Sequence, residues 1–267
     1  MNRPLVYHVG GEEKVRVSKD LVYRSGPEAR ADVYEPAGIT RNAKAPIVVL
    51  IHGGVPKVPV LPKDWGFFQS WGRLLAASGF VAVAFNHRLG FPEPFMIEAA
   101  DDVERVLAYV RCHAAECGGD PERIGLIAYS AGGPLLSRYI REARPDVRCL
   151  AAFYCMLDVR DSESHRQFMT PEELAVYSPA AQVENHAATM PPMFVMRAGQ
   201  DQIPGLNTWM EKFLDVAIRK NAPITLMIHP AGVHGFDNTT DDERSRKILK
   251  GAIAFLDTHL GPVPSQE

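Results

Sequence analysis

Residues 124–133 read Ile124-Gly125-Leu126-Ile127-Ala128-Tyr129-Ser130-Ala131-Gly132-Gly133 and decide the fold that we expect. The first five residues form a mostly apolar run that is typical of a strand buried on both faces. The apolar positions of the helical pattern that follows are Leu135, Leu136, Tyr139 and Ile140. A nucleophilic serine on a strand-to-helix turn needs small residues two positions before and after it, because strand and helix approach closely there. Ala128 and Gly132 meet that requirement, and the stretch therefore predicts a nucleophile at Ser130.

A second Ser-x-Gly triplet, Ser70-Trp71-Gly72, lacks this context. The bulky Phe68 stands two positions before its serine, and no apolar run precedes it. Such triplets also occur in ordinary turns. The strand before and the helix after are therefore what distinguish Ser130.

Further apolar runs and helical patterns alternate along the chain. The runs are residues 47–51, 81–85, 149–153, 193–196 and 224–228. The helical stripes are Ile97, Ala100, Val103, Leu107 and Val110, then Leu249, Ala252, Ile253 and Leu256. Strands that alternate with helices predict a mostly parallel sheet with helices on its faces, an α/β fold. A buried helix is the alternative interpretation of any single run. Residues 30–36 alternate at strand period, which predicts an antiparallel strand before the parallel part.

We expect one domain over residues 1–267, with two segments that depart from the alternation. Residues 157–190 are polar and contain no clear strand, which favours a small cap or lid over the sheet. Residues 261–267 contain two prolines and are expected to fray.

Composition excludes several classes of partner. The net charge is −3, and no cluster of Lys and Arg suggests nucleic acid or an anionic membrane. No apolar run approaches the roughly 20 residues of a membrane span. The cysteines Cys112, Cys117, Cys149 and Cys155 form no CxxC pair, and no His-Glu-x-x-His motif is present. We therefore expect no metal, no secretory signal and a cytoplasmic protein.

The motif Ile51-His52-Gly53-Gly54 follows the first buried run. Paired glycines let backbone amides turn toward a bound carbonyl oxygen, although an ordinary tight turn is the alternative. One oxyanion donor would be the amide of Ala131, and the other that of Gly54 or Val55, because Pro56 has no amide hydrogen.

His234, in Ala231-Gly232-Val233-His234-Gly235-Phe236, lies just past the last apolar run, where its ring could reach Ser130 as a general base. His87 and His229 lack this loop context, and His52 is better placed to shape its turn. The remaining histidines, in polar or helical surroundings where we expect surface residues, are His8, His113, His165, His186 and His259.

Asp201 follows the run at 193–196 and is the predicted acid that orients His234. The order Ser130, Asp201, His234 is the order used by hydrolases with a serine on a strand-to-helix turn. Asp158 also follows a buried run and is the main rival, whereas Asp237 comes after the histidine. A solvated turn carboxylate is the alternative interpretation of Asp201.

Aromatic residues follow the ends of the predicted strands, where ligands bind in open α/β sheets. We expect a substrate pocket lined by Trp65, Phe68, Phe91 and Phe95. Burial in the core is the alternative interpretation for each of them.

Taken together, these motifs resemble the α/β-hydrolase superfamily over about residues 20–260. Within it, the chain resembles the small esterases and dienelactone-hydrolase-like enzymes with a His-Gly-Gly motif. The resemblance implies an eight-stranded, mainly parallel sheet and a Ser-His-Asp triad that needs no metal or organic cofactor. Three positions depart from family patterns: Ala128 replaces a glycine, Val55 replaces the third glycine of lipase-type motifs, and Ser130 replaces the cysteine of true dienelactone hydrolases.

We expect a carboxylic ester hydrolase that acts on small to medium acyl esters through an acyl-enzyme. A thioesterase or peptidase would use the same triad, and rates on the three substrate types would separate them. A non-catalytic binding module on a hydrolase fold is the alternative from another class, which labelling by a fluorophosphonate would distinguish. The expected partner is a small-molecule ester, and the sequence leaves a homodimer open.

Overall fold

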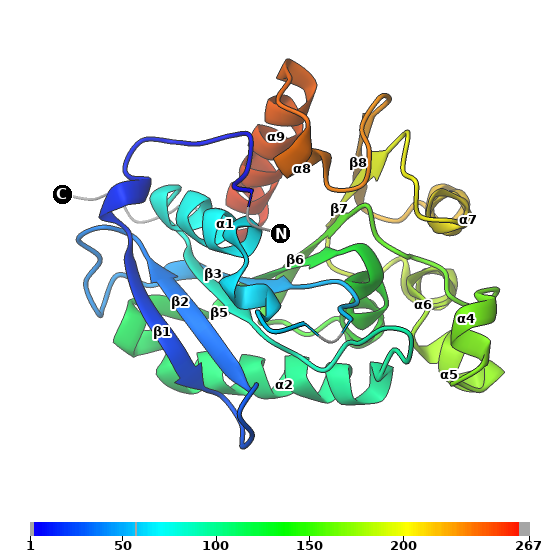
Figure 1. Ribbon diagram of the computed structural model, residues 1–267, viewed down its shortest axis with the longest axis horizontal. Helices are drawn as coiled ribbons and strands as arrows, with labels where there is room; N and C mark the ends of the chain where they lie inside the picture. Colours follow the sequence, from blue (N-terminus) through cyan, green and yellow to red (C-terminus); the bar gives the residue numbers. More distant parts are fainter. Residues whose placement is uncertain (1–2, 57, 262–267) are drawn as a thin grey trace.

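An eight-stranded sheet forms the centre of the computed structural model, which describes residues 3–56 and 58–261 (Figure 1). The strand order is β1-β2-β4-β3-β5-β6-β7-β8, with β3 to β8 parallel and β1 and β2 antiparallel to their neighbours. The strands are β1 Arg16–Val22, β2 Arg30–Glu35, β3 Ala45–Ile51, β4 Val81–Phe85, β5 Gly119–Tyr129, β6 Val147–Phe153, β7 Met193–Ala198 and β8 Ile224–His229. The predicted α/β fold with a mainly parallel sheet is confirmed. The fraying predicted for 261–267 falls, except for Gly261, outside the described residues.

Helices cover both faces of the sheet. In Figure 1, α1 and α9 lie on one side, and α2, α6 and α7 lie on the other. The α-helices are α1 Gly66–Ala77, α2 Met96–His113, α3 Ser137–Glu142, α4 Glu163–Arg166, α5 Pro171–Val176, α6 Pro179–His186, α7 Leu206–Arg219, α8 Phe236–Thr239 and α9 Glu243–Leu260, and the 3₁₀ helices are η1 Glu12–Lys14, η2 Pro62–Asp64, η3 Ala114–Cys117 and η4 Ser130–Leu136. Within the described ranges, no helix combines the length and the apolar character that a membrane crossing requires.

The apolar runs differ in how deeply they are buried. Every residue of β3 and β4 is buried, as the unbroken apolar runs predict. The prediction that residues 224–228 are buried on both faces is wrong, because β8 is the edge of the sheet and its Leu226 is 39% exposed.

The stripe predicted for α2 is also partly wrong. Ile97 is 53% exposed, while Met96 and Ala99 are buried against the core. Val103, Leu107 and Val110 are buried as predicted. The buried face at the start of the helix is therefore shifted by one residue from the predicted stripe.

The segment after Ser130 is helical, but it begins as 3₁₀ helix η4 and becomes α-helix α3 only at Ser137. Pro134 has no amide hydrogen to donate to the Ser130 carbonyl, which an α-helix requires. That carbonyl instead accepts a hydrogen bond from the amide of Met156 at 3.0 Å. The tight first turn is thus joined to the segment that follows β6.

Residues 157–190 fold into α4, α5 and α6 between β6 and β7. Helix α6 packs against α3 and α7, and α4 contributes Ser164 and His165 to a pocket beside Ser130. The description of this segment as a cap on one domain stays a prediction.

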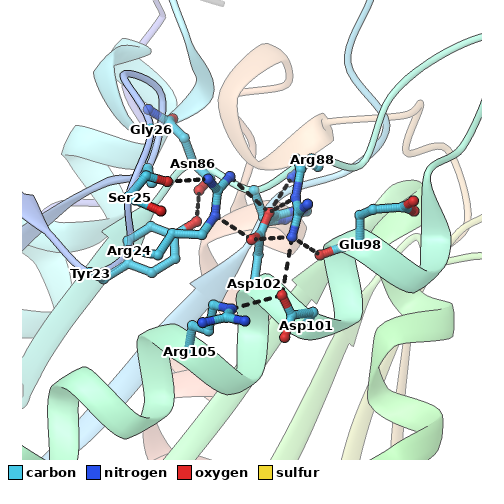
Figure 2. Close-up of polar contacts among 12 residues, drawn as sticks. Tyr23, Arg24, Ser25, Gly26, Asn86, Arg88, Glu98, Asp101, Asp102 and Arg105 are labelled. Carbon is cyan, nitrogen blue, oxygen red and sulfur yellow. Dashed lines mark hydrogen bonds and ion pairs between the residues drawn. The ribbon is translucent and has the colours of Figure 1, made fainter.

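A buried carboxylate joins three parts of the chain near the carboxyl ends of the strands (Figure 2). Asp102 on α2 is fully buried and accepts hydrogen bonds from Nε of Arg24 at 2.6 Å and from Nε of Arg88 at 2.9 Å. The backbone amide of Arg88 also donates to it at 3.0 Å. Asp102 therefore fixes the segment that follows β4 against α2.

We expect Asp102→Ala to lower the free energy of unfolding by about 3–5 kcal/mol, since it leaves two guanidinium groups beside an empty buried position. Asp101→Ala is the matched control, because Asp101 is on the same helix turn but 46% exposed, and it should cost under about 1 kcal/mol. Urea unfolding of both variants measures the difference. Equal losses in the two variants would contradict the role assigned to Asp102.

Candidate active site

Ser130 lies at a sharp turn between β5 and η4, with a backbone φ of 53°. This left-handed conformation is strained for a residue with a side chain. A Cβ built on Gly132 would lie 2.5 Å from the carbonyl oxygen of His52, so no larger residue fits there. Ala128 is fully buried. The turn therefore has the geometry that the sequence predicts, with small residues on both sides of the serine.

His234 lies in the loop between β8 and α8, and its ring is oriented by a carboxylate. Its Nδ1 is 2.7 Å from Oδ2 of Asp201, whose side chain is fully buried. The rival Asp158 instead bonds to Arg160 at 2.8 Å and to Ser178 at 2.9 Å. The hydrogen bond to Asp201 places the proton on Nδ1 and leaves Nε2 as the acceptor.

Ser130 and His234 line the same pocket of about 220 Å³, called the His234 pocket below. Within the described part of the chain, no hydrogen bond joins the two side chains, which is common in hydrolases without substrate. The ring of Tyr154 packs against that of His234 with a centroid distance of 4.6 Å. The imidazole of His234 is thus held at Nδ1 by Asp201 and by its packing against the ring of Tyr154.

A second pocket of about 270 Å³, called the His165 pocket below, lies on another side of Ser130. Gly54 and Ser130 line both pockets, whereas Ala131 lines only the His165 pocket and His234 only the His234 pocket. The serine therefore stands between two cavities, with one of them open to the histidine.

The two alternatives for the oxyanion donor differ in their hydrogen bonds. The amide of Val55 donates to the carbonyl of Leu89 at 3.2 Å, so the proposal of Val55 as a donor is corrected by this contact. The amide of Gly54 donates to no described residue. Oxyanion donation by the amides of Gly54 and Ala131 stays a prediction.

The ring of His52 contacts the backbone of the His-Gly-Gly loop that follows β3. Its Nδ1 is 2.6 Å from the carbonyl oxygen of Gly53, and its Nε2 accepts from the amide of His87 at 3.2 Å. The two imidazoles stack at 3.5 Å, and burial lowers the pKa of His52 to about 4. His52 is therefore neutral and shapes the turn, as the sequence interpretation holds.

The predicted aromatic residues lie in different places. Trp65 and Phe68 line the His234 pocket, and Phe91 lines the His165 pocket. Phe95 departs from the expectation, because it lines a separate pocket of about 470 Å³ that contains neither Ser130 nor His234.

Sequence reasoning missed three side chains beside the site. His165, expected at the surface, is 9% exposed and lines a pocket with Ser130. Tyr154 and Asp237 are buried, and the Tyr154 hydroxyl donates to Asp237 at 2.9 Å. The indole of Trp71 lies 3.4 Å from the other oxygen of the same carboxylate. The available signals were the position of Tyr154 just after β6 and that of Asp237 three residues after His234.

Burial raises the pKa of Asp237 to about 6, although the hydrogen bonds from Tyr154 and Trp71 oppose that shift. A titratable carboxyl group therefore lies under the ring that contacts His234. Among the described residues, no cluster of three or more His, Cys, Asp or Glu could hold a metal ion.

Two family models and several curated proteins are similar to this chain. The model of the dienelactone hydrolase family matches residues 93–259, and a model described as BD-FAE matches residues 31–140. A probable isoprenylcysteine alpha-carbonyl methylesterase from Oryza sativa is 28% identical over 82% of this chain and 57% of its own length. Esterase LipQ from Mycobacterium tuberculosis is 22% identical over 91% of this chain and 63% of its own length. The chain thus spans about three fifths of these relatives.

Solved structures share the fold. Esterase 2 of Thermogutta terrifontis, in its apo form, superimposes with a TM-score of 0.72 at 20% identity, covering 95% of this chain and 97% of its own. Esterase B of Lactobacillus rhamnosis gives a TM-score of 0.72 at 17% identity, with coverages of 93% and 87%.

We expect Asp237→Asn to change how stability depends on pH. Folding raises the pKa of Asp237 from 3.8 to about 6, so its contribution to stability is present below about pH 4 and is lost as the pH rises through 6. The asparagine variant lacks this loss. Its free energy of unfolding, relative to the native protein, should therefore increase by roughly 1–3 kcal/mol between pH 4 and pH 7. Urea unfolding across that range measures it, and a difference that does not vary with pH would contradict the assignment.

Proposed function

The chain belongs to the dienelactone hydrolase family, and on that premise we propose that it is a carboxylic ester hydrolase with Ser130 as nucleophile. The observation that carries the proposal is the hydrogen bond of 2.7 Å between His234 and Asp201, beside a pocket that Ser130 also lines. The esterases among the similar proteins support the same class of reaction.

In the proposed mechanism, Nε2 of His234 accepts the proton of the Ser130 hydroxyl as its oxygen attacks the ester carbonyl. Asp201 stabilises the imidazolium that forms. The amides of Gly54 and Ala131 donate hydrogen bonds to the oxyanion, and removal of one such donor typically costs about 10²–10³ in kcat.

The tetrahedral intermediate then collapses. The bond to the alcohol oxygen breaks, and His234 gives its proton to that oxygen as the alcohol leaves. Ser130 keeps the acyl group as an ester. A water molecule that loses its proton to His234 attacks this acyl-enzyme, releases the acid and restores the serine.

The size of the site supports small to medium substrates. Pockets of about 220 and 270 Å³ lie just below the roughly 300–1,000 Å³ that is usual for small-molecule sites. Leu89, Met156 and Leu206 make much of the larger pocket apolar, which suits a hydrocarbon acyl chain.

The four cysteines are free, which supports the cytoplasmic location proposed from the sequence. The homodimer stays a prediction.

Ser130→Ala should lower kcat for p-nitrophenyl butyrate by at least about 10³-fold, because the nucleophile is lost while binding remains. Asp201→Asn should lower kcat by up to about 10⁴-fold through loss of the imidazole tautomer. Ser70→Ala, in the other Ser-x-Gly triplet, is the matched control and should keep kcat. Hydrolysis by Ser130→Ala at the native rate would refute the proposal.

A further inference from the structure

His165 is a buried polar residue in an otherwise largely apolar pocket. It lies on α4, is 9% exposed, and shares the His165 pocket with Ser130. Its Nδ1 is 2.7 Å from the hydroxyl oxygen of Ser162, which fixes the orientation of the ring. The apolar neighbours that line the same pocket include Leu89, Phe91, Met156, Leu206 and Trp209.

The second ring nitrogen of His165 is free to meet a ligand. Nε2 has no hydrogen-bond partner in the described ranges, and it is not among the nitrogens that the protein seals from solvent. Burial lowers the pKa of His165, so the ring is neutral and each nitrogen either donates or accepts one hydrogen bond. Transfer of a polar atom from water into an apolar pocket costs free energy unless the atom gains a hydrogen-bond partner there. Nε2 provides such a partner.

The chemistry of the proposed reaction decides which half of the ester meets His165. The alcohol oxygen must receive a proton from His234, so the alcohol lies on the side of the His234 pocket. His234 does not line the His165 pocket, whereas Ser130 and Ala131 do. The acyl chain, attached to the same carbon and directed away from His234, therefore occupies the His165 pocket.

We propose that His165 is a specificity-determining residue whose free ring nitrogen hydrogen-bonds an oxygen on the acyl chain of the substrate. The substrate class is then esters of hydroxy or oxo acids rather than of plain fatty acids. This inference rests on the proposed ester hydrolysis at Ser130.

Ser164 is the competing polar residue, because it lines the same pocket. Its hydroxyl oxygen already lies 3.1 Å from that of Ser162 and 3.4 Å from Nδ1 of His165. The Ser164 hydroxyl thus contacts the groups that orient the His165 ring. The test must therefore distinguish the effect of Ser164 from that of His165.

The test compares acyl groups of equal shape that differ in one oxygen. Phenyl 3-hydroxybutanoate is paired with phenyl 3-methylbutanoate, and phenyl 2-hydroxybutanoate with phenyl 2-methylbutanoate. In each pair a hydroxyl replaces a methyl group, and a hydroxyl serves either tautomer of the ring. The ratio of kcat/KM within a pair is measured for the native protein, His165→Leu and Ser164→Ala, so that intrinsic ester reactivity cancels between proteins.

We expect His165→Leu to lower the hydroxyl-to-methyl ratio by about 2- to 10-fold in at least one pair, the effect of one hydrogen bond. Measurable hydrolysis of the methyl member shows that the variant folds, and any change in its own rate cancels because the comparison uses the ratio within the pair. Ser164→Ala should leave the ratio unchanged. If His165→Leu does not fold, His165→Met provides the same apolar replacement with a more adaptable side chain.

Unchanged ratios in both pairs, with hydrolysis still dependent on Ser130, would overturn this inference and leave the proposed function intact. A ratio that falls only in Ser164→Ala would overturn it as well. A third pair places the hydroxyl on the alcohol: 2-hydroxypropyl butanoate against 2-methylpropyl butanoate. If His165→Leu lowers the hydroxyl-to-methyl ratio of kcat/KM in this pair, the inference is also overturned, because the alcohol and not the acyl chain would then occupy the His165 pocket. Absence of any ester hydrolysis by the native protein would remove the function and the inference together.

Discussion

The left-handed backbone of Ser130 is the constraint on which the rest of the site depends. A residue with a side chain in this conformation stores on the order of 1–3 kcal/mol, and the surrounding packing must hold it. Gly132 pressed against the His52 carbonyl and the Ser130 carbonyl bound to Met156 provide that packing. The turn therefore requires β3, β5 and the segment after β6 to meet, which the parallel sheet provides at the carboxyl ends of its strands.

Groups away from the serine prepare the loops around it. Asp102 accepts a hydrogen bond from the amide of Arg88, in the segment after β4. In the same segment, the carbonyl of Leu89 accepts a hydrogen bond from the amide of Val55. That contact leaves the amide of Gly54 without a protein partner among the described residues. Tyr154, in turn, contacts the ring of His234 and donates a hydrogen bond to Asp237. Buried polar groups thus orient each half of the site, which suits a site that must not reorganise during the reaction.

The parallel strands and the pairing of His234 with Asp201 could be predicted from the sequence, because unbroken apolar runs and loop positions after strands are local signals. The exposure of Ile97 could not, because the packing of the whole helix on the sheet sets which face is buried. His165 lies among polar residues in the sequence, and tertiary folding alone brings it beside Ser130. The engagement of the Val55 amide likewise depends on a segment more than 30 residues away.

In the proposed function, the strained serine is the residue that reacts with substrate. Incubation of the native protein with a fluorophosphonate, followed by digestion and mass spectrometry, tests it most directly, because such reagents modify an activated serine and leave ordinary hydroxyls unmodified. We predict one adduct per chain, on the peptide that contains Ser130. An intact protein without adduct, or an adduct on another serine, would contradict it.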